Sequence, residues 1–330
     1  MREEMKFLVT GAAGFIGANV SKRLLEAGHQ VVGIDNLNDY YDVQLKKARL
    51  AQLQAKQNFQ FHPIDITDKV AITNLTKNYL HIDRIIHLAA QAGVRYSLTA
   101  PFAYTEANVV GHLTMLEVCK TLPIKHFVYA SSSSVYGGNQ KLPFSIQDPV
   151  NQPISLYAAT KRSCELMSYT YSHLFGIPST GLRFFTVYGP WGRPDMSAFI
   201  FTKAILEGAE IPVFNGGDMQ RNFTYIDDIV KGTVACLDTP PNQSNTIEPP
   251  NRVYNIGNNR TEKLMDFIDI LQTLIGKKAK IRFETIQPGD VKETYADISE
   301  TTRDLGFMPK TNIKEGLEHF VSWYRKYYDL

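Results

Sequence analysis

Short apolar runs alternate with amphipathic segments through the first half of the chain. The runs have strand length and predict strands at residues 6–10, 30–34, 59–62, 84–89, 127–131 and 178–184. Between them, apolar positions recur at helical spacing, which predicts one helix that ends near residue 27 and others at residues 44–56, 69–78, 102–121 and 156–175. Because continuous apolar strands separated by helices are typical of parallel sheets, the alternation predicts a doubly wound α/β sheet with helices on both faces.

The alternation loosens after about residue 184. Residues 186–196 are rich in Gly and Pro and are expected to form a loop over the cleft at the sheet's carboxyl edge. Residues 239–251 contain much Pro and Asn and predict a surface connection with little core material. The remaining predicted elements are helices at residues 197–207, 261–275 and 314–328, a helix that ends near residue 237, and strands at residues 253–256 and 280–284.

Composition and charge exclude several classes of protein. The 330 residues carry a formal net charge of +2, from 35 Lys and Arg against 33 Asp and Glu, and show no basic run of the kind that binds nucleic acid. The three cysteines are widely spaced and the eight histidines lack ligand spacing, so we predict neither a disulfide framework nor a metal site. No apolar signal core or membrane span is visible, which predicts a cytoplasmic protein with no membrane partner.

A glycine-rich turn follows the first predicted strand. Gly11 and Gly14 would let the backbone turn tightly and approach a diphosphate, and Gly17 would let the next helix lie close to the strand. The N-terminus of that helix offers N–H groups to the anion. After the second strand, the Asp35 carboxylate can accept both hydrogen bonds of an adenosine ribose, and Asn36 stands where a 2′-phosphate would need a cation. The G-x-x-G-x-x-G spacing differs from the common dinucleotide motif, but the set predicts an NAD site rather than an NADP site.

A second group of polar residues lies between residues 131 and 161. Tyr157 and Lys161 are four residues apart and share one face of a helix. An ammonium beside a phenol favours the phenolate, which can act as a base. The serines at 131–134 lie at the end of a predicted strand and supply hydroxyls that could pass a substrate proton to the Tyr157 oxygen. A lone Tyr-x-x-x-Lys arises by chance in many helices, but with the glycine turn upstream the set predicts a proton-relay site for oxidising an alcohol.

These two groups resemble those of the extended short-chain dehydrogenase/reductase family, and the resemblance covers nearly the whole chain. Within the family the chain is most similar to the nucleotide-sugar 4-epimerases, and among these to the UDP-glucuronate 4-epimerases. The segments that carry the resemblance are residues 35–42, 87–97, 131–134 and 183–196. It implies an NAD-binding Rossmann domain over residues 1–185 and a smaller, mainly nucleotide-sugar-binding α/β domain over residues 186–330, with segments around 220–256 folded back onto the first.

The resemblance implies reversible oxidation at C4 of a UDP-sugar. Tyr157, held as phenolate by Lys161, would take the 4-hydroxyl proton directly or through Ser132, while the C4 hydride passes to NAD. The 4-keto sugar would then rotate and take the hydride back on its other face. The expected substrate pair is UDP-glucuronate and UDP-galacturonate, with NAD bound tightly and not consumed. Lys161 would also bond the hydroxyls of the nicotinamide ribose.

The same resemblance implies the residues that hold NAD. Asp65 and Ile66 match positions beside the adenine, and Asn108 is expected to contact the backbone on the cofactor side. The complete expected set is Gly11, Gly14, Phe15, Ile16, Gly17, Asp35, Asn36, Asn38, Asp65, Ile66, Leu88, Ala89, Ala90, Asn108, Tyr157, Lys161 and Phe185.

Positions next to Ser132 separate the chain from related enzymes. Sugar 4,6-dehydratases carry an Asp-Glu pair after the catalytic Thr, and UDP-glucuronate decarboxylases carry Glu at the place of Ser134, whereas this chain has Ser133 and Ser134. Small hydroxyls leave room and hydrogen bonds for a C6 carboxylate. We expect these two serines and Thr186 to bond that carboxylate with Arg193 nearby, although a solvated loop arginine is the alternative for Arg193. The other expected substrate contacts are Arg95 near the phosphates, Arg221 at the UDP diphosphate and Asp290 on the uridine side.

Two other functions stay open. A 4-epimerase of UDP-N-acetylglucosamine or of its uronic acid would carry a similar serine run. A non-catalytic NAD-binding sensor arises in the family when the Tyr or the Lys is lost, and the retained Tyr157 and Lys161 argue against it. The helices at 102–121 and 156–175 pair between subunits in this family, which implies a homodimer. Their apolar residues Met115, Met167 and Tyr171 would suit either the interface or the core.

Overall fold

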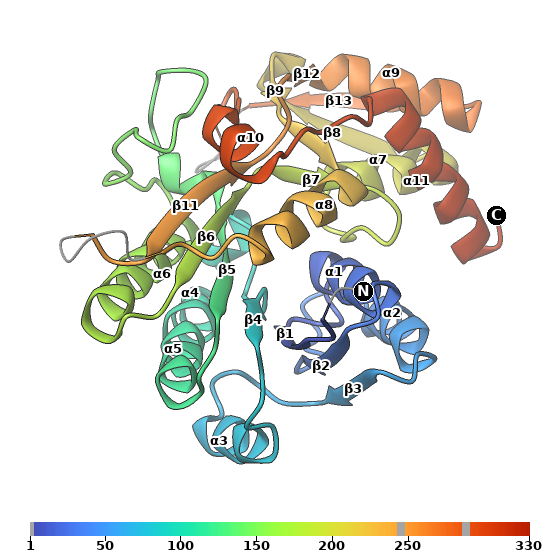
Figure 1. Ribbon diagram of the computed structural model, residues 1–330. Coiled ribbons are helices and arrows are strands. Elements are labelled where there is room, and N and C mark those ends of the chain that lie inside the picture. Colours follow the sequence, from blue (N-terminus) through green and yellow to red (C-terminus); the bar gives the residue numbers. More distant parts are fainter. Residues whose placement is uncertain (1–2, 243–247, 286–290) are drawn as a thin grey trace.

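The computed structural model describes residues 3–242, 248–285 and 291–330. Within these residues, seven parallel strands form one sheet in the order β11-β6-β5-β4-β1-β2-β3, with helices on both faces (Figure 1). This confirms the predicted doubly wound α/β sheet. The strands are β1 (Lys6–Thr10), β2 (Gln30–Ile34), β3 (Phe59–His62), β4 (Arg84–His87), β5 (His126–Ser132), β6 (Ser179–Phe184), β7 (Thr186–Tyr188), β8 (Glu210–Phe214), β9 (Gln220–Arg221), β10 (Phe223–Tyr225), β11 (Asn251–Ile256), β12 (Glu262–Lys263) and β13 (Lys280–Glu284). The helices are α1 (Phe15–Glu26), α2 (Val43–Gln54), α3 (Lys69–Asn78), α4 (Pro101–Tyr104), α5 (Gly111–Thr121), α6 (Leu156–Phe175), α7 (Ser197–Glu207), α8 (Ile226–Leu237), α9 (Leu264–Ile275), α10 (Ser299–Leu305) and α11 (Ile313–Tyr328).

Alternate residues of each central strand pack into opposite layers of the core. Phe7 and Val9 of β1 lie in the apolar cluster that contains residues of α1, α2 and α8. Leu8 lies in the cluster that contains residues of α3, α5 and α6. In β5, Val128 and Phe127 divide between the two clusters in the same way. Both faces of the sheet are therefore covered, which explains why its strands appear in the sequence as continuous apolar runs.

The second half of the chain adds three small sheets beside the large one. β8 pairs in parallel with β13, β7 pairs in parallel with β10, and β9 pairs antiparallel with β12. Figure 1 shows β7, β8, β9, β12 and β13 with α7, α9 and α11 in the upper part of the view. From the same half of the chain, β11 joins the large sheet as the neighbour of β6.

The structure contains the short elements β9, β10, β12 and α10, which the sequence does not predict, and it differs from the sequence prediction in three further places. Residues 186–188 form the strand β7, whereas the sequence predicts loop for 186–196, because a three-residue strand is too short to show a period. The sequence does not predict β8, whose centre is Pro212; the strand accepts proline because it has β13 as its neighbour in a two-stranded sheet. The single helix predicted over 102–121 is divided by a π-helical turn at Thr105–Val110.

Cys119, Cys164 and Cys236 are all buried and none forms a disulfide. The Cys164 thiol lies 3.1 Å from the Asn108 carbonyl oxygen, so it packs α6 against the π-helical turn. Of the helices in the described ranges, none is both long and apolar enough to cross a lipid bilayer.

Candidate active site

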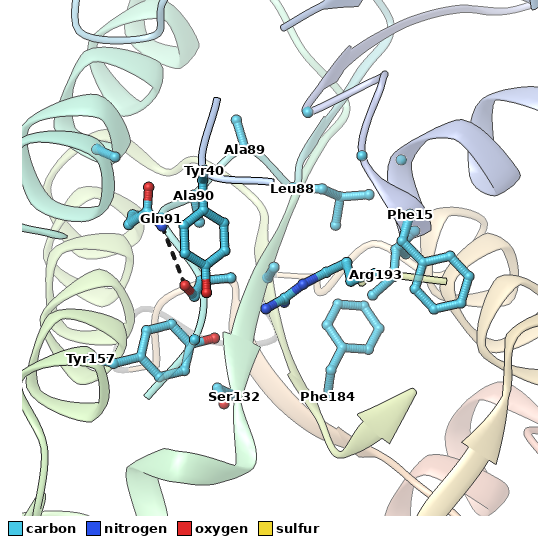
Figure 2. A pocket seen from close by; sticks show the side chains of 18 of the residues that line it. Phe15, Tyr40, Leu88, Ala89, Ala90, Gln91, Ser132, Tyr157, Phe184 and Arg193 are labelled. Carbon is cyan, nitrogen blue, oxygen red and sulfur yellow. Dashed lines mark hydrogen bonds between the residues drawn. The ribbon is translucent and has the colours of Figure 1, made fainter. Parts of the chain in front are cut away.

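A cavity of about 380 Å³ lies at the carboxyl ends of the sheet strands. Ligands of doubly wound sheets bind at this edge, because the connections after the strands open there. Figure 2 shows side chains that converge on it, among them Phe15 after β1, Ser132 at the end of β5 and Tyr157 on α6. The cavity therefore joins the glycine turn to the residues predicted to carry the chemistry.

Two glycines of the glycine turn, Gly11 and Gly17, have no room for a side chain. Gly11 has a φ of +71°, and a Cβ there would lie 2.8 Å from the backbone nitrogen of Ala89. A Cβ on Gly17 would lie 2.0 Å from the Gly11 carbonyl oxygen. Helix α1 begins after Gly14 with no side-chain cap and no acidic residue in its first turn. Its first N–H groups and the positive end of its dipole are thus directed at the cavity, which fits the diphosphate of a dinucleotide.

Asp35 lies at the end of β2 on the cavity wall. Its two carboxylate oxygens accept hydrogen bonds from the backbone N–H groups of Ala13 (3.1 Å) and Leu37 (2.8 Å). A carboxylate has about four lone-pair sites, so two remain for ribose hydroxyls. Burial raises the pKa of the Asp35 carboxyl above its ordinary value, although these N–H groups and Lys46 act in the opposite direction. The geometry fits an adenosine ribose.

Lys46 is a cavity residue that sequence reasoning missed. It comes from α2, and its ammonium donates to the Asn38 backbone oxygen (2.5 Å) and side-chain oxygen (2.6 Å). Asn36 donates to the Asp65 carboxylate at 2.7 Å, so that the residues after β2 and β3 are joined. The four side chains all line the cavity. The sequence does not show that Lys46 is buried. Its only signal is a charged residue at a helix position where a charge is unusual.

Ser132, Tyr157 and Lys161 lie together on the cavity wall. Helix α6 starts at a Ser155 cap, whose hydroxyl accepts from the Ala158 N–H at 3.1 Å, and it carries both Tyr157 and Lys161. The buried Lys161 ammonium donates to the Ala130 carbonyl of β5 at 3.0 Å, which fixes it beneath the cavity. Ser132 donates to the Ser134 hydroxyl at 3.1 Å. The phenol, the ammonium and the serine hydroxyl thus come from two adjoining elements, α6 and β5.

A buried ion pair fixes α6 to the sheet. Glu165 of α6 receives a two-pronged contact from Arg183 of β6, at 2.8 Å and 3.0 Å, and the Ser131 hydroxyl donates to it at 2.6 Å. Burial alone would raise the pKa of the Glu165 carboxyl, but Arg183, Ser131 and Arg162 lower it by more. The net pKa lies below the ordinary value, so the carboxylate stays ionised. The pair lies one turn beyond Lys161 and sets the height of the helix against β5. Sequence reasoning missed it because a distant pair has no local pattern.

The predicted sugar side of the cavity carries Ser133, Ser134, Thr186 and Arg193. Ser133 and Ser134 lie in a short 3₁₀ turn after β5, and Thr186 begins β7. Arg193 is not a solvated loop residue: its guanidinium binds Asp195 through two nitrogens, and Figure 2 shows it directed into the cavity. The arrangement can hold an anionic group beside the phenol of Tyr157.

The structure brings most of the predicted residues to the cavity lining and leaves three of the described ones out of it. Those that line it are Gly11, Gly14, Phe15, Ile16, Gly17, Asp35, Asn36, Asn38, Asp65, Ile66, Leu88, Ala89, Ala90, Ser132, Ser133, Ser134, Tyr157, Lys161, Phe185, Thr186 and Arg193. Asn108 lies behind the wall and exchanges two hydrogen bonds with the backbone of Gln91. The Arg95 guanidinium lies 4.3 Å from the Phe214 ring centre, and Arg221 donates to the backbone oxygens of Gln220 and Lys292. Asp290 lies outside the described residues.

Comparison with known proteins points to one family. A sequence profile described as "NAD dependent epimerase/dehydratase family" matches residues 7–257. The chain is 46% identical to UDP-glucuronate 4-epimerase 3 of Arabidopsis thaliana over 99% of its length and 78% of the relative. It is 44% identical to a probable UDP-glucuronate 4-epimerase of Rhizobium meliloti strain 1021, over 98% of each chain. A crystal structure of UDP-glucuronic acid 4-epimerase from Bacillus cereus with UDP-glucuronic acid and NAD superposes with a TM-score of 0.90 and 37% identity, covering 98% of this chain and all of that one.

Proposed function

Because the chain belongs to the NAD-dependent epimerase/dehydratase family, we propose that it is an enzyme that inverts C4 of UDP-glucuronate to give UDP-galacturonate, reversibly and with NAD as its cofactor. The observation that carries the proposal is one cavity lined by the glycine turn, by Tyr157 with Lys161, and by Arg193 with Thr186. The first set suits a dinucleotide, the second an alcohol under oxidation, and the third a carboxylate.

The glycine turn and Asp35 would hold NAD. At Gly11 and Gly17 the structure has space for backbone only, and α1 presents uncapped N–H groups, as a diphosphate requires. Bound NAD supplies a reversible hydride acceptor for C4. Asp35 keeps two acceptor sites for the adenosine ribose, and Asn36 and Asp65 would lie toward the adenine.

Tyr157 is the proposed base and Lys161 its support. The Lys161 ammonium is fixed by the Ala130 carbonyl and keeps donors for the nicotinamide ribose. In this mechanism Tyr157 acts as the phenolate, which takes the proton of the 4-hydroxyl and returns it after the 4-keto sugar has turned. Ser132 would hold the sugar hydroxyl or carry its proton.

Ser133, Ser134, Thr186 and Arg193 are the proposed contacts of the C6 carboxylate. Hydroxyls at 133 and 134 donate to a carboxylate and offer no acid for removing water or carbon dioxide from the sugar. An arginine fork matches a carboxylate in shape and charge. We propose Arg95, Arg221 and Asp290 for the nucleotide part, with Arg95 and Arg221 reaching it by rotation of their long side chains.

We also propose a homodimer through α4, α5 and α6. Phe102, Leu113, Leu166 and Tyr169 are exposed on these helices, and such apolar side chains suit an interface. Of the residues that suited either the interface or the core, Met115 is fully buried in the core and Met167 and Tyr171 pack against the core, so the support for the interface comes from the four exposed residues. Sedimentation of the wild type and of Leu166→Glu tests the proposal: a dimer and a monomer are expected, and a monomeric wild type would contradict it.

Two proposals concern organisation and location. We propose that residues 1–185 form the NAD-binding domain and residues 186–330 mainly the sugar-binding domain; the pairing of β11 with β6 supports the return of the segment around 220–256 to the first. We propose a cytoplasmic location, which the three unpaired thiols support because reduced cysteines are typical of that compartment.

A substrate panel followed by NMR tests the function. Purified protein is mixed with UDP-glucuronate, UDP-glucose, UDP-N-acetylglucosamine or the uronic acid of UDP-N-acetylglucosamine, without added NAD. We expect UDP-glucuronate to give UDP-galacturonate and the neutral sugars to react far more slowly. Turnover of UDP-N-acetylglucosamine or its uronic acid with UDP-glucuronate left untouched would refute the substrate assignment. Bound NAD with no turnover of any sugar would point to a sensor.

A further inference from the structure

Tyr40, Asp195 and Arg193 form a row of hydrogen bonds at the cavity wall. The Arg193 Nε donates to one Asp195 oxygen at 3.0 Å, and its Nη2 donates to the other at 2.5 Å. The Tyr40 hydroxyl donates to the second oxygen at 3.0 Å. Neither arginine contact uses Nη1. Figure 2 shows the Arg193 guanidinium and the hydroxyls of Tyr40 and Tyr157 directed toward the same part of the cavity.

The charges of this row are balanced before any ligand enters. Burial alone would raise the pKa of the Asp195 carboxyl, but the Arg193 guanidinium and the Tyr40 hydroxyl lower it by more. The net pKa lies below the ordinary value, so the carboxylate is ionised. Burial and the Asp195 charge raise the pKa of the Tyr40 hydroxyl, so it remains a donor. A guanidinium with one bidentate partner keeps a fixed plane, because rotation would break both hydrogen bonds at once.

Two other contacts confine the row from the backbone side. Gly93 has a φ of +96°, and a Cβ there would lie 2.4 Å from the Tyr40 hydroxyl oxygen and 3.6 Å from an Asp195 oxygen. The buried Arg49 donates to the backbone oxygens of Trp191 and Gly192, at distances of 2.7–3.1 Å. The backbone before Arg193 is thus tethered without help from Asp195, so a change at Asp195 acts on the arginine side chain rather than on the course of the loop.

We propose that Asp195, supported by Tyr40, is a positioning residue for the sugar carboxylate: it fixes the plane of the Arg193 guanidinium and keeps the carboxylate subsite electrically neutral. This rests on the proposed function, because it assigns Arg193 to the C6 carboxylate of a uronate. Without Asp195, the arginine would sample several rotamers and would lose affinity by the cost of ordering them again. Without Arg193, Asp195 would repel the same carboxylate.

The test compares four variants with two matched controls. The variants are Asp195→Asn, Tyr40→Phe, Arg193→Met and the double variant Arg193→Met/Asp195→Asn. The controls come from a second Tyr–Asp–Arg row that lies outside the cavity lining: Tyr254 donates to Asp304 at 3.0 Å, and Arg303 contacts the same carboxylate at 2.6 Å and 3.0 Å. Tyr254→Phe and Asp304→Asn therefore remove equivalent groups. KM and kcat for UDP-glucuronate, the Kd of UDP and the bound NAD are measured for each.

We expect Asp195→Asn to raise KM for UDP-glucuronate about tenfold and Tyr40→Phe about threefold, with kcat, UDP affinity and bound NAD close to wild type. The controls should match the wild type. The double variant should have a lower KM than Arg193→Met alone, because it removes the negative charge that Arg193→Met leaves uncompensated beside the carboxylate subsite. A purely structural role for Asp195 gives no such rescue.

Three outcomes would overturn the proposal. The first is an unchanged KM for UDP-glucuronate in Asp195→Asn. The second is a Kd of UDP that rises in Asp195→Asn by as much as the KM for UDP-glucuronate. The third is a KM of the double variant that exceeds the KM of Arg193→Met by the full factor found for Asp195→Asn. If Asp195→Asn does not fold, the KM of Tyr40→Phe for UDP-glucuronate is compared with that of its control Tyr254→Phe. An unchanged KM in Tyr40→Phe then overturns the proposal. A wild type that does not turn over UDP-glucuronate would refute the proposed function itself, which separates the two failures.

Discussion

Alanine at Gly17 tests whether the glycine turn is the cofactor cradle. The added Cβ would lie 2.0 Å from the Gly11 carbonyl oxygen and 2.8 Å from its carbonyl carbon. Ordinary contact begins at 3.4 Å, so α1 and the turn must separate by about 1.4 Å. Both neighbours are backbone atoms, which cannot rotate away as a side chain can.

The magnitude follows from the cost of overpacking. Forcing one extra carbon into a packed site typically costs about 1–3 kcal/mol. If the folded turn recovers by moving away from the diphosphate, the same energy lowers NAD affinity by roughly 5–150-fold, since each 1.4 kcal/mol is about tenfold. Gly14→Ala should have a smaller effect, because its Cβ would lie 3.0 Å from the Gly11 oxygen.

The assay is the NAD content of purified protein together with the Kd for added NAD. Gly138→Ala is the matched control, because its Cβ would lie 3.8 Å from the nearest side chain and outside the cavity lining. We expect NAD affinity to fall in the order Gly138→Ala, Gly14→Ala, Gly17→Ala, and the wild type to have the same affinity as the Gly138→Ala control. Wild-type affinity in Gly17→Ala would refute the assignment of this turn to the cofactor.

Three further predictions concern the base, the ion pair and the ribose contact. Tyr157→Phe should lose activity by a factor of about 10²–10⁴ while retaining NAD, because it removes the proton acceptor; near-normal turnover measured by NMR would remove Tyr157 from that role. Glu165→Gln leaves Arg183 buried beside a neutral amide and should cost about 3–5 kcal/mol, which calorimetry would record as a fall in Tm of roughly 6–15 °C. Glu26→Gln, which changes an exposed pair, should shift Tm far less, and equal shifts would contradict this account. Because burial raises the pKa of Asp35, its carboxyl gains a proton at a higher pH than an exposed aspartate does, and bound NAD should be lost as the pH falls into the acid range. The variant Asp35→Asn should bind NAD weakly at every pH. If NAD binding by that variant kept the pH dependence of the wild type, the ribose role of Asp35 would be contradicted.

The sheet and most of the cavity wall were predictable, because their signals are local. The central strands are buried on both sides and appear as apolar runs, and Gly11, Asp35 and Tyr157 each occupy a position fixed by a strand or a helix. Residues whose role depends on distant partners give no such signal. The role of Asp195 depends on Tyr40, which lies 155 residues earlier in the sequence, and the role of Glu165 on α6 depends on Arg183 of β6.

The small elements were hard to predict for another reason. β7 and β9 have three and two residues, which is shorter than the period that identifies a strand. The segments on either side of the π-helical turn at Thr105–Val110 have helical spacing, so periodicity alone predicts one helix that includes α4, the turn and α5. Asn108 of this turn exchanges two hydrogen bonds with the backbone of Gln91, a residue of the cavity lining.

The most direct test of the account uses UDP-glucuronate that carries deuterium at C4, with purified protein in ordinary water and no added NAD. If the phenol of Tyr157 removes only the hydroxyl proton and the carbon-bound hydrogen returns to the same carbon, the UDP-galacturonate formed will keep its deuterium at C4. Replacement of that deuterium by hydrogen from the solvent during inversion would contradict the account.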